Sequence, residues 1–453
     1  MNFIPSLASL EEALSEFSPE KRKRALLAIC DHYSDELKLT ESHKGKINLH
    51  AHTFFSYNAY GHSPTALAWI AKKKGLDFIG IVDFDVLDGV NEFLEACELL
   101  CVRGVAGMET RVFIPEYRNI EINSPGQPGI AYHMGAGFTD SDLTEMVQPA
   151  FNSFRTQAAE RNYDIVQKLN AYLNPLSLDF EAEVLPLSPK GNVTERHIVY
   201  KLIEKSFDEL DDTENFWQKK LKLSSDRLAG LLNDRIKFEQ FLRKKMIKRG
   251  GVAYIKPDPE KFPTISEFNR IIRSAGAIPC MAWLDGTSEG ESDIERLLEF
   301  MIDKGVCAVN IIPDRNWNLT ETDVKTRKIE ALYKFVDLAD EQHLPILIGT
   351  EMNSNGQKLV DDLNVPELAP LADSFRRGAE FIYGHTMLER LWGLGYQSAW
   401  AQKNFKNREK RNTFYTEVGK VIPPGVVDKK IQKQISNAVS PEKILHTFNN
   451  RNG

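Results

Sequence analysis

The sequence predicts an α/β protein whose main domain is a β/α barrel. From residue 47 onward, short apolar segments of strand length alternate with segments of helical pattern. Residues 77–82 form a nearly continuous apolar run, which is typical of a parallel strand buried on both faces. Polar residues stand at the ends of several of these runs. The active site of a β/α barrel lies at the carboxyl ends of its strands, so we expect functional side chains there.

Composition sets the broad class of protein. The chain has 453 residues, 42% of them apolar, enough for one large barrel with insertions or for two or three domains. A formal net charge of −7 disfavours nucleic acid as a partner. The five cysteines include no C-x-x-C pair, which is typical of a reducing cytoplasm. With no signal-peptide pattern and no apolar run near the roughly 18–20 residues of a membrane span, we expect a cytoplasmic protein without membrane contact.

The first two segments along the chain are a helical arm and the first part of the barrel. Residues 1–45 form the N-terminal helical arm, in which Ser18-Pro19 starts a helix that runs to Leu37 and packs outside the active domain. Residues 46–148 form the first part of the barrel. Its predicted strands cover 47–56, 77–82, 102–108, 120–122 and 131–134, and its predicted helices cover 64–75 and 90–100.

The remaining segments are an insertion, the second part of the barrel and a basic extension. Residues 149–260 are polar, charged and mostly helical, and we interpret them as a helical insertion that covers the site. Residues 261–400 resume the alternation, with helices expected at 266–274, 294–304 and 321–341 and strands at 277–281, 308–312, 346–349 and 380–383. Residues 401–453 hold 11 Lys and Arg against 4 Asp and Glu. This basic C-terminal extension either touches RNA or a phosphorylated partner or, as we favour, forms a solvated helix packed on the barrel.

The most informative strand carries the pair His50 and His52. Successive side chains of a strand point to opposite faces, so these two imidazoles point the same way and can meet one metal ion. A histidine pair alone is weak evidence, because two polar residues on an exposed edge strand give the same pattern. The further candidates along the chain favour the metal site.

Several motifs, in their order, resemble those of the polymerase and histidinol phosphatase (PHP) family. The resemblance covers about residues 46–360 and implies a distorted, TIM-like (βα)7 barrel that binds two or three metal ions and mostly hydrolyses phosphoesters. The matching segments are His50 to Ser56 (H-x-H-T-x-x-S), Asp83 to Val90 (T-D-H-D and a trailing D-G-V), Glu109 (a strand-end ligand), His133 (a His before a Gly), Glu195 to Ile198 (R-x-H-I of the nucleotide-phosphatase branch), residues 275–279 (before A-H-P) and residues 349–353 (G-S-D-x-H).

The sequence departs from this family pattern at several expected ligands. Bulky apolar groups replace two histidines, and we expect them to fill the space of a missing ion. The substituted positions are Tyr57 and Asn58 (for an Asp), Phe84 and Trp283 (for His), and Glu351 and Asn353 (for Asp and His). His385 or Asp285 would be needed to restore a larger site. We therefore predict fewer ions than the family norm, namely one.

The side chains that survive suit one transition ion. Three imidazoles and two carboxylates remain, and zinc, manganese and iron all accept such mixed ligands. The predicted ligands are His50, His52, Glu109, His133 and Glu351.

Five further residues are candidates for catalysis and substrate binding. Asp83 and His197 are the catalytic candidates, although Asp83 could instead orient a ligand histidine or only cap a strand. Arg196 and Arg315, with Arg111 as a further candidate, would hold a phosphate through their guanidinium groups. The alternatives are an ordinary surface helix for Arg196 and His197 and a solvated loop for Arg315.

Two classes of function follow. The first is a metal-dependent hydrolase, a phosphoesterase acting on a small phosphorylated molecule through a reduced metal site. The second is a degenerate barrel of the PHP type that binds a ligand or partner without catalysis. We favour the hydrolase, because buried charge is costly to desolvate and an idle site has no physical reason to keep it.

Overall fold

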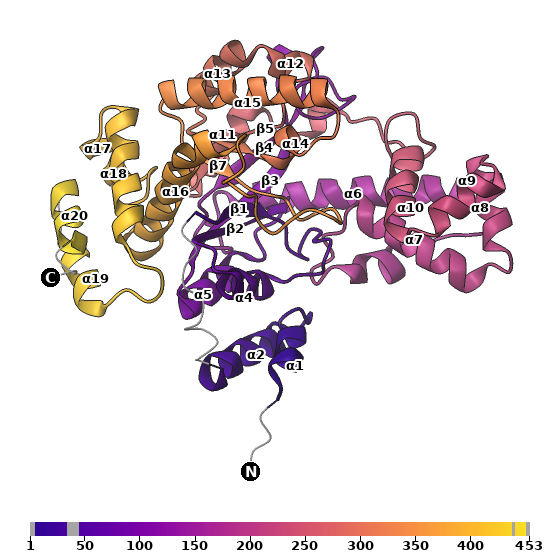
Figure 1. The fold of residues 1–453 in the computed structure, drawn as a ribbon, viewed down its shortest axis with the longest axis horizontal. Helices are drawn as coiled ribbons and strands as arrows, with labels where there is room; N and C mark the ends of the chain where they lie inside the picture. Colours follow the sequence, from indigo (N-terminus) through magenta and orange to yellow (C-terminus); the bar gives the residue numbers. More distant parts are fainter. Residues whose placement is uncertain (1–4, 34–44, 437–439, 450–453) are drawn as a thin grey trace.

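A computed structural model describes residues 5–33, 45–436 and 440–449 of the chain. Its centre is a seven-stranded sheet in which the strands follow one another in chain order (Figure 1). Its strands are β1 (Ile47–Ala51), β2 (Phe78–Phe84), β3 (Arg103–Phe113), β4 (Ile130–Ala136), β5 (Ile278–Trp283), β6 (Ala308–Ile311) and β7 (Ile346–Ile348). Most of their residues are buried, as the continuous apolar runs predict for strands covered on both faces.

The sheet is mixed and curls into a nearly closed barrel. β1 to β3 run parallel, as do β5 to β7, but β4 runs antiparallel to both of its neighbours. β3 reaches β4 through a loop and a short 3₁₀ turn, η1 (Pro115–Tyr117), so no helix crosses over to restore the parallel direction. The two edges meet just beyond β7, where Glu351 N donates to His50 O (2.7 Å) and His52 N donates to Glu351 O (2.8 Å).

Helices cover the outside of the barrel, and their ends follow the sequence signals. α4 begins after Ser63, whose hydroxyl accepts from Ala66 N, and ends at Gly75, which has a left-handed backbone. The covering helices are α4 (Pro64–Lys74), α5 (Val90–Leu100), α11 (Ile265–Ser274), α12 (Glu289–Ser292), α13 (Ile294–Asp303), α14 (Asp314–Trp317) and α15 (Thr322–Glu341), with the turns η5 (Pro259–Lys261) and η6 (Ala369–Leu371). Their apolar faces join the strands in one large hydrophobic core.

The N-terminal arm is a pair of helices docked beneath α4 and α5, namely α1 (Leu7–Ala13) and α2 (Pro19–His32) (Figure 1). Ser18 caps α2 as predicted, while the expected continuation to Leu37 lies outside the described residues. Arg22 is only 2% exposed and pairs with Glu92 of α5. The arm is therefore tied to the barrel by a partly buried ion pair.

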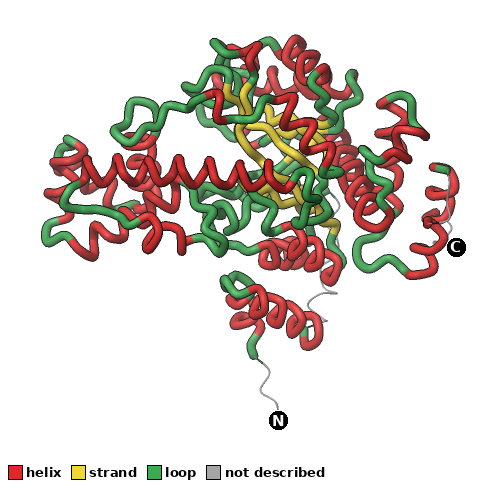
Figure 2. Tube along the Cα trace, turned by 180° about the vertical axis from the view of Figure 1, so that it is seen from behind, coloured by secondary structure: helices red, strands yellow, loops and turns green. Residues whose placement is uncertain are grey.

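Residues after β4 form a helical body with its own hydrophobic cluster. The long helix α6 (Gln148–Leu173) leads from the sheet into it, as Figure 2 shows from behind. The other elements are η2 (Phe180–Val184), η3 (Leu185–Leu187), α7 (Glu195–Glu209), α8 (Thr213–Leu221), α9 (Ser225–Leu232), α10 (Arg235–Leu242) and η4 (Arg243–Ile247). Asn192 fastens this body to the barrel, because its side-chain amide donates to Phe55 O (3.0 Å) and Phe84 O (2.9 Å).

Two predicted strands are wrong. Residues 120–122 lie in the loop between β3 and β4. Residues 380–383 lie inside the helix α16 (Ala372–Trp392), which is buried on nearly all sides. A short apolar run has the same pattern in a buried helix as in a buried strand, so the sequence alone could not separate the two.

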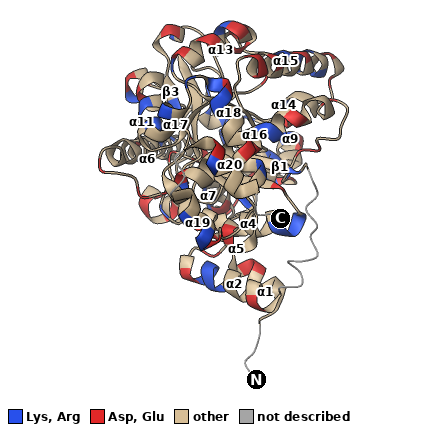
Figure 3. Cartoon of the chain, turned by 90° about the vertical axis from the view of Figure 1, so that its left-hand side faces the viewer, with Lys and Arg blue, Asp and Glu red and all other residues tan. Residues whose placement is uncertain are grey.

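The C-terminal extension packs on α16, as the favoured interpretation has it. It comprises α17 (Ala399–Asn404), α18 (Arg408–Val421), α19 (Lys429–Ser436) and α20 (Pro441–Asn449). Gly384 of α16 and Gly419 of α18 let the two backbones touch, since an added Cβ would meet Tyr415 O and Glu380 O at about 2 Å. Basic and acidic residues are interspersed on this side of the molecule (Figure 3). None of the helices in the described ranges is both long and apolar enough to cross a membrane.

Candidate metal centre

Two histidines and one glutamate converge at the carboxyl end of β1 to β3. His50 and His52 are 1% and 0% exposed, and their ring centroids are 5.2 Å apart. Glu109 of β3 places Oε2 3.8 Å from His50 Nε2 and 3.9 Å from His52 Nε2. Among the residues that the structure describes, these three form the one group of His, Cys, Asp or Glu close enough to share an ion.

The strand register explains why Glu109 meets the histidines. Phe84 at the end of β2 lies beside Glu109 of β3, and neighbouring residues in register point to the same face. The His52 ring stacks on Phe84 with ring centroids 4.3 Å apart. Phe84 therefore packs against the His52 imidazole, and its filling of the space of a missing ion stays a prediction.

Asn310 fixes the orientation of His50. Its side-chain oxygen lies 2.9 Å from His50 Nδ1, while its amide nitrogen donates to Leu347 O at 3.3 Å. Because the Asn310 oxygen can only accept, Nδ1 of His50 carries the proton. The lone pair on Nε2 is then directed at the centre of the site.

A chain of hydroxyl contacts fixes His52 in the same way. Ser56 Oγ donates to Asp83 Oδ1 (2.6 Å) and lies 3.2 Å from His52 Nδ1, so it accepts the Nδ1 proton. Asp83 also accepts from Thr53 N (2.8 Å) and Thr53 Oγ1 (2.7 Å). Asp83 thus positions His52 through Ser56 and anchors the loop after β1, which is the orienting role considered for it from the sequence.

The three groups fit a divalent ion by their chemistry. Neither histidine Nε2 has a hydrogen-bond partner among the described residues. Burial lowers the pKa of both imidazoles, so both offer a neutral lone pair. Burial also raises the pKa of Glu109 well above its usual range, and the nearby Glu351 raises it further. A cation would favour the ionised carboxylate. Metal–ligand bonds of about 2.0–2.2 Å place ligand atoms roughly 3–4.4 Å apart, and the two distances from Glu109 Oε2 to the histidine Nε2 atoms, 3.8 and 3.9 Å, lie in this range.

Glu351 borders this group but is held by another partner. Arg315 Nη2 donates to both of its carboxylate oxygens, at 2.8 and 3.0 Å, and Gln357 Nε2 adds a contact of 3.3 Å. Burial alone would raise the pKa of Glu351, but the charge of the Arg315 guanidinium outweighs it and lowers the pKa to about 2. The structure therefore brings Glu351 and Arg315, predicted as a metal ligand and a phosphate ligand, together as an ion pair.

His133 does not join the cluster. The register of β4 sets His133 beside Thr110, one residue past Glu109 and therefore on the opposite face of the sheet. Its Nε2 lies 2.8 Å from Asn269 Oδ1 on α11, in the outer helical layer. The predicted ligand is thus a buried residue that packs against the outer helices in this structure, and the register of β4 is the reason.

The start of α7 carries Arg196 and His197 to the rim of the barrel. Arg196 Nη2 donates to Asn353 Oδ1 at 3.3 Å, and the guanidinium lies over the Tyr57 ring. Burial lowers the pKa of Arg196 to about 10, so it stays charged at neutral pH. Glu195 fixes this turn by pairing with three cations of the insertion, Arg161, Arg243 and Lys248.

His197 has a different role from the one predicted. Its Nδ1 accepts from Thr194 N at 3.0 Å and so closes the capping box of α7. Burial lowers the pKa of His197 to about 3, so the ring is neutral at pH 7. A neutral ring with an occupied Nδ1 is not an imidazolium acid, and the geometry gives His197 a capping role.

The other substitutes considered from the sequence lie elsewhere. Trp283 points outward and stacks on Phe335 of α15. The expectation that it fills the space of a missing ion is therefore wrong. His385 is held in α16 by Gly137 O and Tyr396 N, and Asp285 pairs with Lys328. Ser56, Asn310 and Gln357 were given no role from the sequence. Of these, Asn310 could have been found from the sequence, because it is a polar residue within an otherwise apolar strand.

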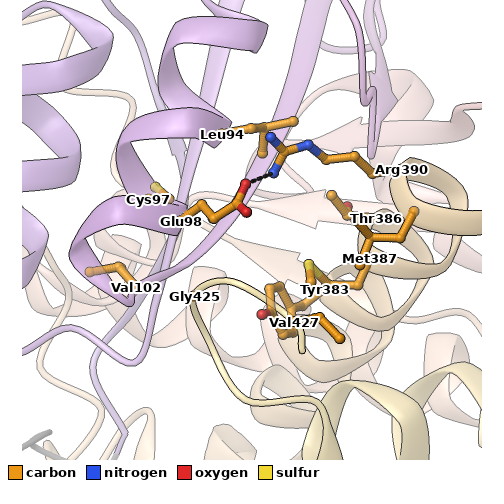
Figure 4. Close-up of a pocket in the computed structure, with 12 residues that line it drawn as sticks. Leu94, Cys97, Glu98, Val102, Tyr383, Thr386, Met387, Arg390, Gly425 and Val427 are labelled. Carbon is orange, nitrogen blue, oxygen red and sulfur yellow. Dashed lines mark ion pairs between the residues drawn. The ribbon is translucent and has the colours of Figure 1, made fainter. Parts of the chain in front are cut away.

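A hollow at the opposite end of the barrel has a different character. It is walled by α5, the start of β3, α16 and residues 425–427. Glu98 and Arg390 pair across it at 3.1 Å (Figure 4). Its charged groups neutralise each other, so it lacks the open ligands of the centre formed by His50, His52 and Glu109.

Comparisons with known proteins add a structural likeness at low identity. No family model and no curated protein matches the chain. Among solved structures, it is similar to an amidohydrolase from Chromobacterium violaceum, solved with sulfate and without metal (17% identity, TM-score 0.48, 73% of this chain and 96% of that chain). It is also similar to a protein of Bifidobacterium adolescentis provisionally described as a metal-dependent phosphoesterase (18%, 0.45, 73% and 97%). At this level of similarity we draw nothing about function from either.

Replacing Ser56 with alanine is expected to weaken metal binding by about 10- to 100-fold, the usual effect of losing a group that orients a ligand. His52 Nδ1 would lose its partner and the ring its fixed direction. Competition with a coloured chelator measures the change. Ser292→Ala, at an exposed site on α12, is the control and should leave the affinity unchanged. An unaltered affinity in Ser56→Ala would contradict the orienting role.

Proposed function

We propose that this protein is a metal-dependent hydrolase of the PHP type that cleaves a phosphoester of a small phosphorylated molecule with one bound ion. The observation that supports this most directly is the pair of unpartnered Nε2 atoms of His50 and His52 facing the Glu109 carboxylate. Such a set suits zinc, manganese or iron. When bound, the ion supplies Lewis acidity and lowers the pKa of water toward about 7.

Two arginines at the rim supply the charge that a phosphate needs. The Arg315 side chain is 40% exposed, and its Nε and Nη1 donate to no group in the described part of the chain. Arg196 lies beside a hollow between the insertion and the barrel that is also lined by Tyr57, Arg243 and Ser354. Guanidinium groups bind phosphate oxygens in pairs, so this rim suits an anionic substrate.

Reconstitution of the purified protein tests the proposal. Metal is removed with a chelator, single ions are added back, and phosphate release is measured from a panel of small phosphomonoesters and phosphodiesters. We expect release with zinc, manganese or iron and none in the metal-free protein. Release that persists in the metal-free protein, or its absence with every ion although the ion binds, would contradict the proposal.

The second candidate is a barrel of the same type that binds a phosphorylated ligand without hydrolysing it. It is favoured by His197, because the histidine predicted as the acid is neutral and caps a helix. Tight binding of an ion and of phosphate, together with no turnover across the panel, would establish this alternative.

A further inference from the structure

The ion pair between Arg315 and Glu351 has a position that the proposed function leaves unexplained. The Glu351 side chain is 9% exposed, whereas that of Arg315 is 40% exposed, so one partner faces the site and the other faces solvent. Both hydrogen bonds come from a single nitrogen, Nη2. The pair therefore lies between the metal centre and the solvent.

The Glu351 backbone is fixed, which limits what its side chain can do. Its N–H and C=O bond to β1 on either side of Ala51, at the seam that closes the barrel. Its backbone bonds directly to His50 and His52, yet its carboxylate oxygens are not among the three groups that meet at the centre. The carboxylate is thus anchored close to the ion site and turned toward Arg315.

We propose that Arg315 and Glu351 form an electrostatic latch that couples anion binding to metal binding. In the free protein, Arg315 holds the Glu351 carboxylate. The free Nε and Nη1 of Arg315 share no open edge of the guanidinium, so a phosphate that binds two of its nitrogens in parallel must use Nη2 as one of them. Such binding takes over the Nη2 donors and releases Glu351 to turn toward the ion. The substrate class is therefore an anion that can accept from a guanidinium fork, and the ion and the anion favour each other.

The sign of the coupling follows from competition for one partner. Arg315 satisfies either Glu351 or the anion with Nη2, and Glu351 satisfies either Arg315 or the ion. Either ligand must break the contact between Arg315 and Glu351 before it can bind fully. Once the anion has broken this contact, the metal ion binds without that cost, and the reverse holds when the metal ion binds first. Linkage makes the two effects equal, and couplings of this kind are commonly about 5- to 150-fold.

The experiment measures Mn²⁺ affinity with and without inorganic phosphate. Free Mn²⁺ is followed by electron paramagnetic resonance, with solutions lacking protein as calibration for phosphate binding to the ion itself. We expect phosphate to tighten Mn²⁺ binding by about tenfold in the unaltered protein. In Arg315→Ala the effect of phosphate should vanish, and Mn²⁺ without phosphate should bind at least as tightly as in the unaltered protein.

Two variants sharpen the result. Glu351→Gln should bind phosphate more tightly than the unaltered protein when both are metal-free, because Arg315 has lost its competitor. Arg327→Ala removes the same charge from α15 without touching Glu351 and should keep the full phosphate effect.

The latch rests on the proposed metal site, and the two can fail separately. Equal Mn²⁺ affinity with and without phosphate in the unaltered protein would overturn the latch and leave the hydrolase standing. Weaker Mn²⁺ binding in Arg315→Ala would also overturn it. Absence of any Mn²⁺, Zn²⁺ or Fe²⁺ binding would instead remove the metal site itself.

Discussion

Replacing His50 or His52 with alanine is expected to lower the affinity for a divalent ion by more than about 100-fold, beyond the usual effect of losing a group that only orients a ligand. Each change removes one of the two neutral lone pairs that face Glu109. Only one imidazole and one carboxylate then remain to hold the ion. Elemental analysis after dialysis against low metal measures the loss. The rise in melting temperature on adding zinc or manganese should vanish as well, because that rise depends on the affinity.

His133→Ala is the matched control. It removes a buried imidazole from β4, but this imidazole lies on the other face of the sheet and contacts Asn269. We expect a lower melting temperature with full metal content. Loss of metal in His133→Ala, or retention of metal in both His50→Ala and His52→Ala, would show that the centre is assembled differently.

Gly378→Ala is expected to lower the free energy of unfolding by about 4 kcal/mol or more, among the largest effects of a single substitution. Gly378 lies in α16, and an added Cβ would stand 1.9 Å from Ile346 O of β7. The obstacle is backbone rather than a flexible side chain, so helix and strand must separate. Denaturation by urea, followed by circular dichroism, measures the change.

Gly230→Ala makes the same substitution in α9, where an added Cβ meets nothing within 4 Å. Alanine is the better helix former, so this variant should gain about 0.5–1 kcal/mol. A stability of Gly378→Ala close to that of the unaltered protein would mean that α16 does not rest directly on β7.

The sequence predicted most of the barrel because its signals are local. Alternating apolar segments gave the seven strands, and caps such as Ser63 and Gly75 gave helix ends within a residue or two. The pair of histidines on β1 was readable from the two-residue period of a strand. The segment 380–383 was misassigned because its burial comes from packing between β7 and α18, which no local pattern records.

The sequence alone identified His50 and His52 as candidate metal ligands, from residue type and strand period, and Glu109 as a third, from its place at a strand end and the family resemblance. Only the tertiary structure decided which other candidates meet them. The register of β4 turned His133 outward, and the cap of α7 engaged His197. Closure of the barrel brought Glu351 to β1, where Arg315 holds it. These outcomes depend on contacts between residues far apart in the chain, and such contacts are set by strand direction and packing rather than by neighbouring residues.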